Sequence, residues 1–425
     1  MKKFFYLTAL FFIVNVYVYA QYNTPPKGVV RCATDAYMEM MFEKDPSYAE
    51  RLNQINKESD AWIAANKEML EKNKNIITIP VVFHILYFQD HPAFNIPEYR
   101  IHEQLEVLNE DFRRLNADAS LTPAVFQSVA ADAQIEFCLA QRTPSGNLTD
   151  GIVRVKTNVV EFNVGNSMKY ASQGGSNAWD RSKYLNVWVC NLEGGVLGFA
   201  QMPGGPAATD GIVVHYRNFG VTGTSSPYNK GRTATHEVGH WLNLHHIWGD
   251  DAPGACTGTD YCNDTPNQAD PYYGCPSFPQ YSCGSSDMFM NYMDYTNDVC
   301  MNIFTNNQRM RMWAALFGPR NSIRTSNGCQ PGHGTYIEEP SDDIISFNIY
   351  PNPSQGIINI QLETNQEQKN TLFVYNTYGH LVHQETFKNH YIFNKEIMLD
   401  HLSKGVYFVQ LTSSYYTITR KITLL

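Results

Sequence analysis

Apolar and polar positions change their spacing along the chain, and these changes separate helices from strands. Residues 57–72 and 100–114 repeat apolar side chains at helical spacing, which predicts an amphipathic helix over each segment. Shorter runs rich in β-branched side chains predict buried strands, at residues 76–87, 135–139 and 184–190. Helical and extended segments are therefore mixed in this part of the chain.

The pattern changes after residue 344, where short β-like runs alternate with turn residues. These runs cover residues 347–350, 357–362, 371–375, 405–412 and 416–425. Without an intervening helical segment, they predict a small antiparallel β-sandwich over residues 344–425. Residues 330–343 are rich in Pro, Gly and acidic side chains and have no apolar period, which is typical of a linker between folded units.

Residues 1–20 have the pattern of a secretory signal peptide. Two lysines precede an apolar run over residues 4–14, and Val18 and Ala20 provide suitable side chains before a cleavage point. The run is short for a membrane span and Asn15 interrupts it. We therefore expect the chain to be exported, with no transmembrane segment in the mature protein.

Composition limits the classes of function. A length of 425 residues with 43% hydrophobic and 17% charged residues predicts two or three folded units, each with a core. The formal net charge of −9, without a Lys/Arg-rich run, argues against a nucleic-acid partner. Cationic peptides suit this charge better.

The most informative motif is residues 236–246, HEVGHWLNLHH. His236 and His240 are four residues apart, so a helix projects both imidazoles from one face, where they can bind one zinc ion. Glu237 then lies beside the metal, where a carboxylate can take a proton from zinc-bound water during hydrolysis. His246 reaches the same ion only if the chain turns sharply after the helix, and Asn243 tolerates the positive φ that such a turn needs.

This motif is the long HExxHxxGxxH signature with Asn in place of Gly, and together with NYMDYT at residues 291–296 it resembles the metzincin clan and, more narrowly, the pappalysin family. The resemblance covers residues 76–329 and implies an α+β fold: a twisted, mostly parallel sheet with an active-site helix, followed by an irregular subdomain. It also implies a zinc endopeptidase made as a zymogen, with residues 21–75 as the pro-segment. An edge strand at residues 198–201 would pair with extended substrate.

The same resemblance implies three further roles near the metal. Met293 would form the hydrophobic floor of a methionine turn. Tyr295 would donate a hydrogen bond to the oxyanion that develops during peptide hydrolysis, although a core aromatic is the alternative. Asp298 would lie at the base of the S1′ pocket and select Arg, perhaps Lys, after the scissile bond, with a bidentate guanidinium contact; a solvated loop residue is the alternative.

Nine cysteines in an exported chain predict disulfides and one remaining thiol. Cys32 lies apart from the other eight, which fall between Cys138 and Cys329. We expect Cys32 to be the free thiol and to bind zinc as the fourth ligand, displacing the catalytic water until the pro-segment is removed. Asp35 is an alternative switch residue, and neither is a third possibility.

A long irregular stretch, residues 249–286, is rich in acids, Gly, Pro and Cys. The family resemblance implies disulfides Cys256–Cys283 and Cys275–Cys300. It also implies a calcium site, formed by Asp251, Asp260, the carbonyl of Asn263, and Thr265. A solvated acidic loop without calcium is the alternative. The remaining cysteines allow three pairings that the sequence leaves open: Cys138, Cys190, Cys262 and Cys329.

The carboxy-terminal segment also carries recognisable motifs. YPNPSQG at residues 350–356, together with short Gly-containing motifs at residues 374–379 and 402–407, resembles the sorting domain of the bacterial type IX secretion system. A generic or sugar-binding β-sandwich is the alternative. The resemblance implies passage through the secretion machinery and across the outer membrane, with release or attachment to the cell surface.

The sequence thus predicts a secreted zinc endopeptidase that hydrolyses protein or peptide substrates and prefers Arg or Lys at P1′. Two alternatives remain: a surface-tethered adhesin built on a metalloprotease fold, and a zinc amidase acting on cell-wall crosslinks.

Overall fold

The computed structural model divides the chain into two compact units, one formed by residues 1–140 with 150–330 and the other by residues 141–149 with 331–425. It describes residues 24–72, 75–88, 90–250, 252–332, 344–364, 367–377, 380–389, 391–413 and 417–425. The predicted signal peptide and most of the predicted linker lie outside these ranges. Among the described helices, none has the length and apolar character needed to cross a membrane.

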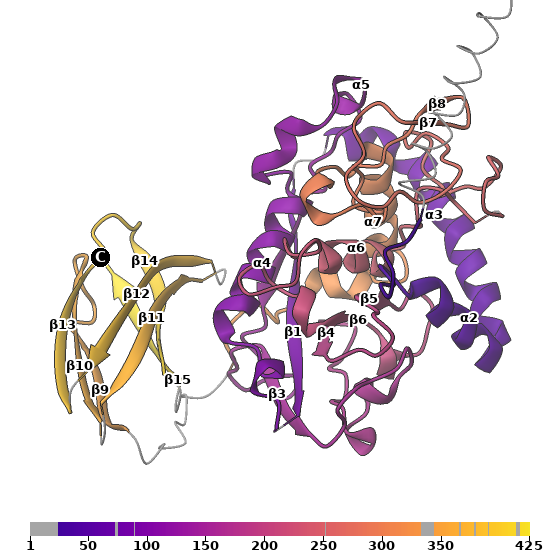
Figure 1. Ribbon diagram of the computed structural model, residues 1–425. Helices are drawn as coiled ribbons and strands as arrows, with labels where there is room; N and C mark the ends of the chain where they lie inside the picture. The colour runs from indigo at the N-terminus through magenta and orange to yellow at the C-terminus, as the bar shows by residue number, and fades with distance from the viewer. Residues whose placement is uncertain are drawn as a thin grey trace, which may run out of the picture. The chain divides into compact units, whose positions relative to one another are not determined.

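The first unit is built around a mostly parallel sheet, as expected (Figure 1). Its strands are β1 (Ile77–Phe88), β2 (Ile135–Leu139), β3 (Ile152–Thr157), β4 (Leu185–Cys190), β5 (Gly198–Ala200) and β6 (Ile212–His215). The order is β2-β1-β4-β6-β5, and β3 pairs with the second half of β1. All pairs are parallel except β5 with β6, so β5 is an antiparallel edge strand.

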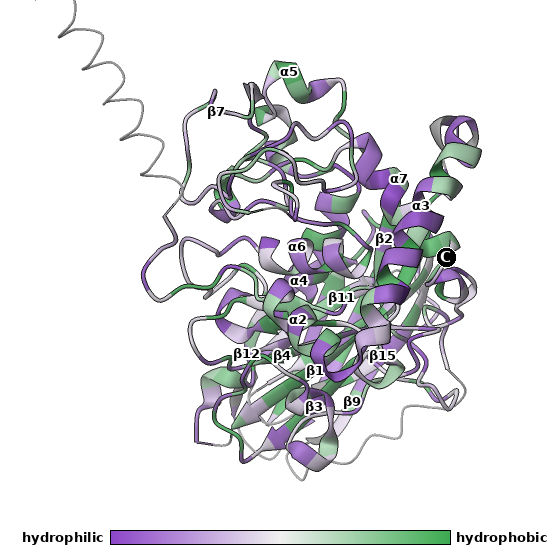
Figure 2. Ribbon diagram, turned by 90° about the vertical axis from the view of Figure 1, so that its right-hand side faces the viewer, coloured by the Kyte–Doolittle hydropathy of each residue, from purple (hydrophilic) through white to green (hydrophobic). Residues whose placement is uncertain are grey.

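Helices cover both faces of this sheet. They are α2 (Thr34–Lys44), α3 (Pro46–Lys72), α4 (Glu98–Phe112), α5 (Ala124–Gln127), α6 (Arg232–Trp241) and α7 (Asn306–Phe317). Alternate side chains of the central strands enter two separate cores, because successive strand residues point to opposite faces. One core packs against α4, α6 and α7, and the other packs against α2. Figure 2 shows hydrophobic colour on the central strands and mixed colour on the covering helices.

Helix α3 is longer than the sequence predicted. We expected a helix over residues 57–72, but it begins at Pro46. Proline is favoured in the first turn of a helix, where its missing N–H costs nothing. Tyr48 and Leu52 in the first turns are buried and four residues apart, so the apolar period extends close to the start of the helix and the predicted start was too late. Trp62 on α3 stacks on Phe317 of α7 with ring centroids 5.1 Å apart, so α3 packs against α7.

Three disulfides join parts of the first unit: Cys138–Cys329, Cys256–Cys283 and Cys275–Cys300. The last two are the pairs implied by the family resemblance, and the first resolves one of the pairings that the sequence left open. All nine cysteines are described, and three of them are free and buried: Cys32, Cys190 and Cys262. The expectation of a single free thiol was therefore wrong, because two core cysteines pack without a partner.

The second unit contains two antiparallel sheets, consistent with the predicted β-sandwich. One has the order β13-β10-β9 and the other β12-β11-β14-β15. Their bounds are β9 (Ile344–Tyr350), β10 (Ile357–Thr364), β11 (Gln368–Asn376), β12 (Leu381–Asn389), β13 (Ile392–Met398), β14 (Gly405–Thr412) and β15 (Thr417–Leu424). Strands β12 and β13 were not predicted from the sequence. Both lie at sheet edges and are largely exposed, so they lack the apolar alternation of β10.

Candidate metal centre and active site

Helix α6 carries the first part of the zinc motif. His236, Glu237 and His240 are all buried on this ten-residue helix. Asn243 has a φ of 72°, which confirms the predicted left-handed turn after the helix. The N–H of Leu244 donates to the carbonyl of Gly239 at 2.9 Å, so the chain folds back over the last helical turn. This turn brings His246 to the same place as the helical histidines.

The three histidines converge through their Nε2 atoms. The Nε2–Nε2 distances are 3.1 Å for His236–His240, 3.0 Å for His240–His246 and 3.3 Å for His236–His246. Each outer Nδ1 has its own partner: the carbonyl of Tyr292 at 2.7 Å, the carbonyl of Leu244 at 2.8 Å and, for His246, Asp35 at 3.2 Å. Nδ1–H donation to these oxygens leaves three Nε2 lone pairs facing one another, an arrangement that suits a bound cation.

A residue from the amino-terminal segment completes this cluster. The Sγ of Cys32 and the three imidazoles all lie within 4.8 Å of one another. Asp35, the alternative switch residue, instead contacts the outer nitrogen of His246. Burial and neighbouring Glu237 raise the pKa of the Cys32 thiol. Nitrogen and sulfur donors in this number match the tetrahedral preference of zinc.

Glu237 lies beside the cluster and is in contact with the amino-terminal segment. Its Oε2 accepts a hydrogen bond from Thr34 Oγ1 at 3.0 Å and lies 3.5 Å from Cys32 Sγ. Its Oε1 is buried and has no hydrogen-bond partner among the described residues. Burial raises the pKa of Glu237 to about 8. A β-carbon added at Gly198 would lie 3.0 Å from Oε1, so the edge strand approaches the base closely because this position has no side chain.

Met293 packs directly beneath the histidine helix. A β-carbon at Gly239 would lie 2.5 Å from its Sδ, well inside contact distance. The turn is held by Asn291, whose Oδ1 accepts the Met293 N–H at 2.9 Å and whose Nδ2 donates to Gln308 at 2.9 Å. Gly239 therefore allows the floor methionine and the metal-binding helix to touch.

Aromatic rings form one wall of the site. Tyr295 lies 4.9 Å from His246 and 5.8 Å from His236, measured between ring centroids. Burial raises its pKa well above the usual value, so the phenol keeps its proton. Trp248 stacks on His246 at 4.4 Å with an interplanar angle of 9°. Trp248 was not predicted as a site residue, although its position two residues after the candidate ligand His246 was a usable signal.

The side chain of Asp298 is fully buried and packs against the first residues of α6. Its Oδ2 accepts the backbone N–H groups of Lys230 at 2.8 Å and Arg232 at 3.2 Å. Its Oδ1 faces the guanidinium of Arg31 at 3.3 Å. Arg31 therefore contacts one oxygen of this carboxylate, because the backbone N–H groups occupy the other.

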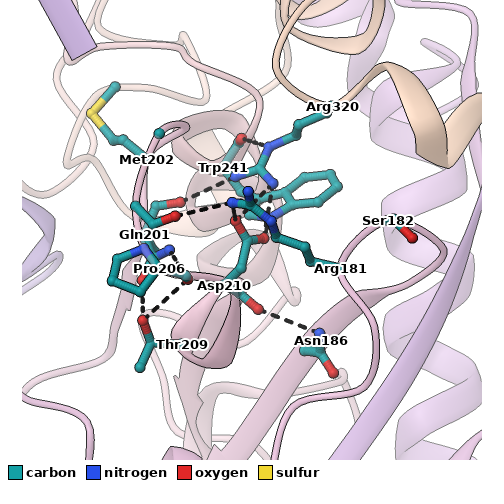
Figure 3. A network of polar contacts seen from close by, with 12 residues as sticks. Arg181, Ser182, Asn186, Gln201, Met202, Pro206, Thr209, Asp210, Trp241 and Arg320 are labelled. Atoms are coloured by element: carbon teal, nitrogen blue, oxygen red, sulfur yellow. Dashed lines mark hydrogen bonds and ion pairs between the residues drawn. The ribbon is translucent and has the colours of Figure 1, made fainter. Parts of the chain in front are cut away.

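The end of α6 is anchored by a buried network that the sequence did not reveal (Figure 3). Asp210 accepts hydrogen bonds from Trp241 Nε1 at 2.7 Å and from Arg320 Nη1 at 2.8 and 3.0 Å. Arg320 Nε also donates to the carbonyl of Trp241 at 2.7 Å. Asp210 lies two residues before β6, and Arg320 Nη2 donates to the carbonyl of Gln201, directly after β5, at 3.4 Å, so this network links the helix to the sheet edge.

Part of the predicted calcium site is described. Asp260 accepts a hydrogen bond from Thr265 Oγ1 at 2.6 Å, and burial raises the Asp260 pKa to about 7. Asp251 lies outside the described residues.

Comparisons with known proteins agree with this geometry. Residues 168–317 match a peptidase family model described as pregnancy-associated plasma protein-A, and residues 348–424 match a secretion system C-terminal sorting domain. An extracellular metalloprotease of Arthroderma benhamiae is 32% identical over 251 residues, which is 56% of this chain and 79% of the relative.

Two solved structures are more similar in sequence. Mature mirolysin of Tannerella forsythia with a cleaved peptide is 49% identical, with a TM-score of 0.57, over 60% of this chain and 97% of that chain. A promirolysin mutant of the same organism is 44% identical, with a TM-score of 0.60, over 69% of this chain and 96% of that chain. The chain therefore belongs to the pappalysin family, and it is a zinc metalloendopeptidase, secreted or attached to the cell surface, with a type IX secretion sorting domain.

Proposed function

We propose that the protein is made as a zymogen and, once its pro-segment is removed, hydrolyses peptide bonds that precede Arg or Lys. The main support is one short segment, residues 31–34, that engages three parts of the site. Cys32 joins the histidine cluster, Thr34 contacts Glu237, and Arg31 reaches Asp298. Residues 21–75 thus form the pro-segment and residues 76–329 the catalytic domain.

In the mature enzyme, Glu237 is the general base. His236, His240 and His246 would hold zinc, which when bound would supply Lewis acidity to the substrate carbonyl and acidify water. Glu237 Oε1 has a free acceptor position, and loss of Thr34 frees Oε2, so the carboxylate can accept a proton and then donate it to the leaving amine. Tyr295 keeps its phenolic proton and can donate it in a hydrogen bond as the oxyanion forms.

The Arg31 pocket supports the proposed specificity. The guanidinium contacts Asp298, donates to Thr233 Oγ1 at 2.8 Å and lies 5.0 Å from the centroid of the Tyr228 ring. A fixed carboxylate, a hydroxyl and an aromatic face together recognise a planar cation. Arg31 therefore serves as a model for the substrate residue at P1′.

The pro-segment runs through the site in the direction opposite to that of a substrate. A residue at P1′ follows the scissile bond, so a substrate chain runs from the metal toward the Asp298 pocket. In the pro-segment Arg31 precedes Cys32, so this chain runs from the pocket toward the metal. It pairs parallel to the sheet edge through Val30 and Val196. Reversed polarity with a sulfur at the metal explains how the segment fills the site without being cut there.

Helix α3 also supports latency, because it contacts a different part of the catalytic domain from residues 31–34. Asn56 Oδ1 accepts hydrogen bonds from Asn243 Nδ2 at 3.2 Å and Arg311 Nη2 at 2.5 Å. The pro-segment therefore also contacts the turn between the second and third histidines. Peptide bonds before Lys72 or Lys74 are candidate self-processing sites. This proposal fails if the Glu237→Ala protein matures normally when expressed alone.

Two further proposals concern a bound calcium ion and the partner that exports the protein. Calcium would stabilise the loop around Asp260 and Thr265, where buried oxygen atoms lie close together. The type IX secretion machinery would be the export partner of the carboxy-terminal unit, which matches the sorting-domain family.

The decisive experiment is mass-spectrometric mapping of cuts in a denatured protein mixture, made by mature enzyme with and without a zinc chelator. Chelator-sensitive cuts before Arg or Lys support the whole proposal. Cuts without that preference retain the protease and reject the role of Asp298. No cuts by zinc-loaded enzyme without its pro-segment would favour an adhesin or a cell-wall amidase.

A further inference from the structure

Beyond the metal, the pro-segment inserts one more side chain into the catalytic unit. Tyr37 of α2 is completely buried, and its ring centroid lies 4.9 Å from that of Phe199 on β5. We call the surrounding cavity the Tyr37 pocket; its walls and base come from Asn166, Lys169, Trp188, Phe199, Gln201 and Thr209. All of these residues belong to the catalytic domain, so the pocket remains when the pro-segment leaves.

The base of the Tyr37 pocket is polar and matches a phenol. Lys169 Nζ donates to the Tyr37 oxygen at 3.1 Å and to the carbonyl of Thr209 at 2.8 Å. The Tyr37 hydroxyl donates to Asn166 Oδ1 at 2.8 Å. Gln201 Oε1 lies 3.2 Å from the same hydroxyl. It also accepts a hydrogen bond from Thr209 Oγ1 at 2.6 Å; Figure 3 shows these two residues. The pocket therefore already holds a hydrogen-bond donor, Lys169, and an acceptor, Asn166, placed to bind one hydroxyl group.

The walls of the Tyr37 pocket suit an aromatic ring. Lys169 Nζ lies 5.4 Å from the ring centroids of both Trp188 and Phe199, and 4.5 Å from that of Tyr37. Lys169 is fully buried while α2 is in place, and burial lowers its pKa to about 7. Removal of α2 would expose this ammonium at the bottom of an apolar cavity.

The pocket also lies on the path of an extended substrate. Along the sheet edge, Gly198 approaches Glu237, Phe199 forms a pocket wall, and Gln201 contributes to the pocket base. The Ala33 N–H donates to the Gly198 carbonyl at 2.9 Å, so the pro-segment itself follows this edge. Because Arg31 lies on the primed side, residues after Cys32 lie over the non-primed side.

The distance along the chain fixes an approximate subsite. Helix α2 begins at Thr34, so Tyr37 lies about 4.5 Å further along a helix that rises about 1.5 Å per residue. The two residues before the helix add at most about 3.3 Å each. Tyr37 therefore lies about as far from Cys32 as the third or fourth residue of a fully extended chain. A cavity of about 610 Å³ adjoins the pocket. Asn166, Pro206 and Thr209 line its catalytic-domain side, and Met40, Met41, Lys44 and Asp45 of the pro-segment line the other, so removal of the pro-segment opens this side to the continuing substrate chain.

We propose that the Tyr37 pocket is a non-primed subsite of the mature enzyme that binds a tyrosine three or four residues before the scissile bond, with Lys169 as its specificity-determining residue. This inference rests on the proposed function, because it uses the primed position of Arg31. It assigns to the pro-segment a second substrate-like side chain, Tyr37, in addition to Arg31.

The test is kinetic profiling of mature enzyme on peptides that all carry Arg at P1′ and differ only at P2 to P5. Each position receives Tyr, Phe or Ser in turn. We expect kcat/KM to be highest with Tyr at P3 or P4, followed by Phe and then Ser, and the Tyr-to-Phe ratio to be about tenfold because one hydrogen-bonded hydroxyl is involved. Equal rates for all three residues at every position would overturn the proposal.

A pair of variants separates the role of Lys169 from general packing. Lys169→Met should remove the preference for Tyr over Phe while preserving the preference for Phe over Ser and for Arg at P1′. Lys156→Met replaces an exposed lysine on β3 and should retain the wild-type profile. If Lys169→Met does not fold, the wild-type profile alone still tests whether the enzyme prefers Tyr at P3 or P4. Failure to cut any of these peptides would instead reject the proposed function.

Discussion

The guanidinium of Arg31 lies 3.3 Å from Oδ1 of Asp298, and both side chains are completely buried. A buried charge pair is costly to break, because the remaining charge loses its partner. In the mature enzyme a substrate Arg would replace Arg31. We therefore expect Asp298→Asn to lower kcat/KM for peptides with Arg at P1′ by about 10- to 100-fold, the value of a charge-assisted hydrogen bond.

The Asp298 prediction needs a stability control, since the same carboxylate accepts two backbone N–H groups at the start of α6. Asparagine retains one oxygen that can accept these bonds, so Tm should change little compared with the activity. Asp180→Asn, at a site far less buried, should change neither quantity. An unchanged preference for Arg in a folded Asp298→Asn enzyme would remove this residue from the pocket assignment.

Cys32 provides a second prediction. If its sulfur blocks the metal, Cys32→Ala should give an uncleaved chain that already hydrolyses small peptides, because water can enter the fourth position. Arg31 and Thr34 still hold the segment, so the activity should remain below that of mature enzyme. Cys190→Ala is the matched control, since Cys190 is also a free buried thiol but lies in the core beneath α2. A fully latent Cys32→Ala chain would contradict the switch.

Local patterns predicted much of this structure. The helical spacing of His236 and His240, the turn at Asn243 and the strands β1, β2 and β4 follow from short-range rules, and the structure places them accordingly. Strands β3 and β6 of the same sheet were not predicted. Edge strands such as β12 did not follow, because exposed strands need no apolar alternation. The sorting unit was therefore recognised mainly by its motifs.

Those short-range rules did not predict contacts between residues that are far apart in the sequence. Arg31 meets Asp298 across 267 positions, and Trp241 meets Asp210 across 31. Each contact depends on the whole fold bringing two segments together, so no local spacing encodes it. The same holds for Lys169, which is fully buried and donates to Tyr37 and Thr209, 132 and 40 positions away.

The disulfide Cys138–Cys329 closes a far longer loop than Cys256–Cys283, with sequence separations of 191 and 27. Loop-closure entropy then predicts a larger stabilisation for the longer loop, by about 2 kcal/mol, if both bridges act mainly on the unfolded chain. We expect Cys138→Ser with Cys329→Ser to lower the free energy of unfolding more than Cys256→Ser with Cys283→Ser. Denaturant titration of the three proteins checks this order, and the reverse order would show that native-state contacts dominate.

Zinc retention gives the last prediction. In the zymogen four donors surround the metal position, from His236, His240, His246 and Cys32, whereas the mature enzyme retains only the histidines. Asp35 also holds the outer nitrogen of His246 in the zymogen, and such outer contacts typically change metal affinity by about 10- to 100-fold. We therefore expect zinc to transfer to a chromogenic chelator at least about tenfold faster from mature enzyme than from zymogen.

Two zymogen variants separate the contributions of Cys32 and Asp35 to the slow loss of zinc. Cys32→Ala should accelerate zinc loss by removing a ligand, and Asp35→Asn should do so to a smaller degree by weakening the orientation of His246. The Glu237→Ala background prevents self-processing during the measurement. If both variants release zinc at the zymogen rate, the slow loss comes from coverage of the site by α2 and α3, because neither side chain would then contribute to holding the metal.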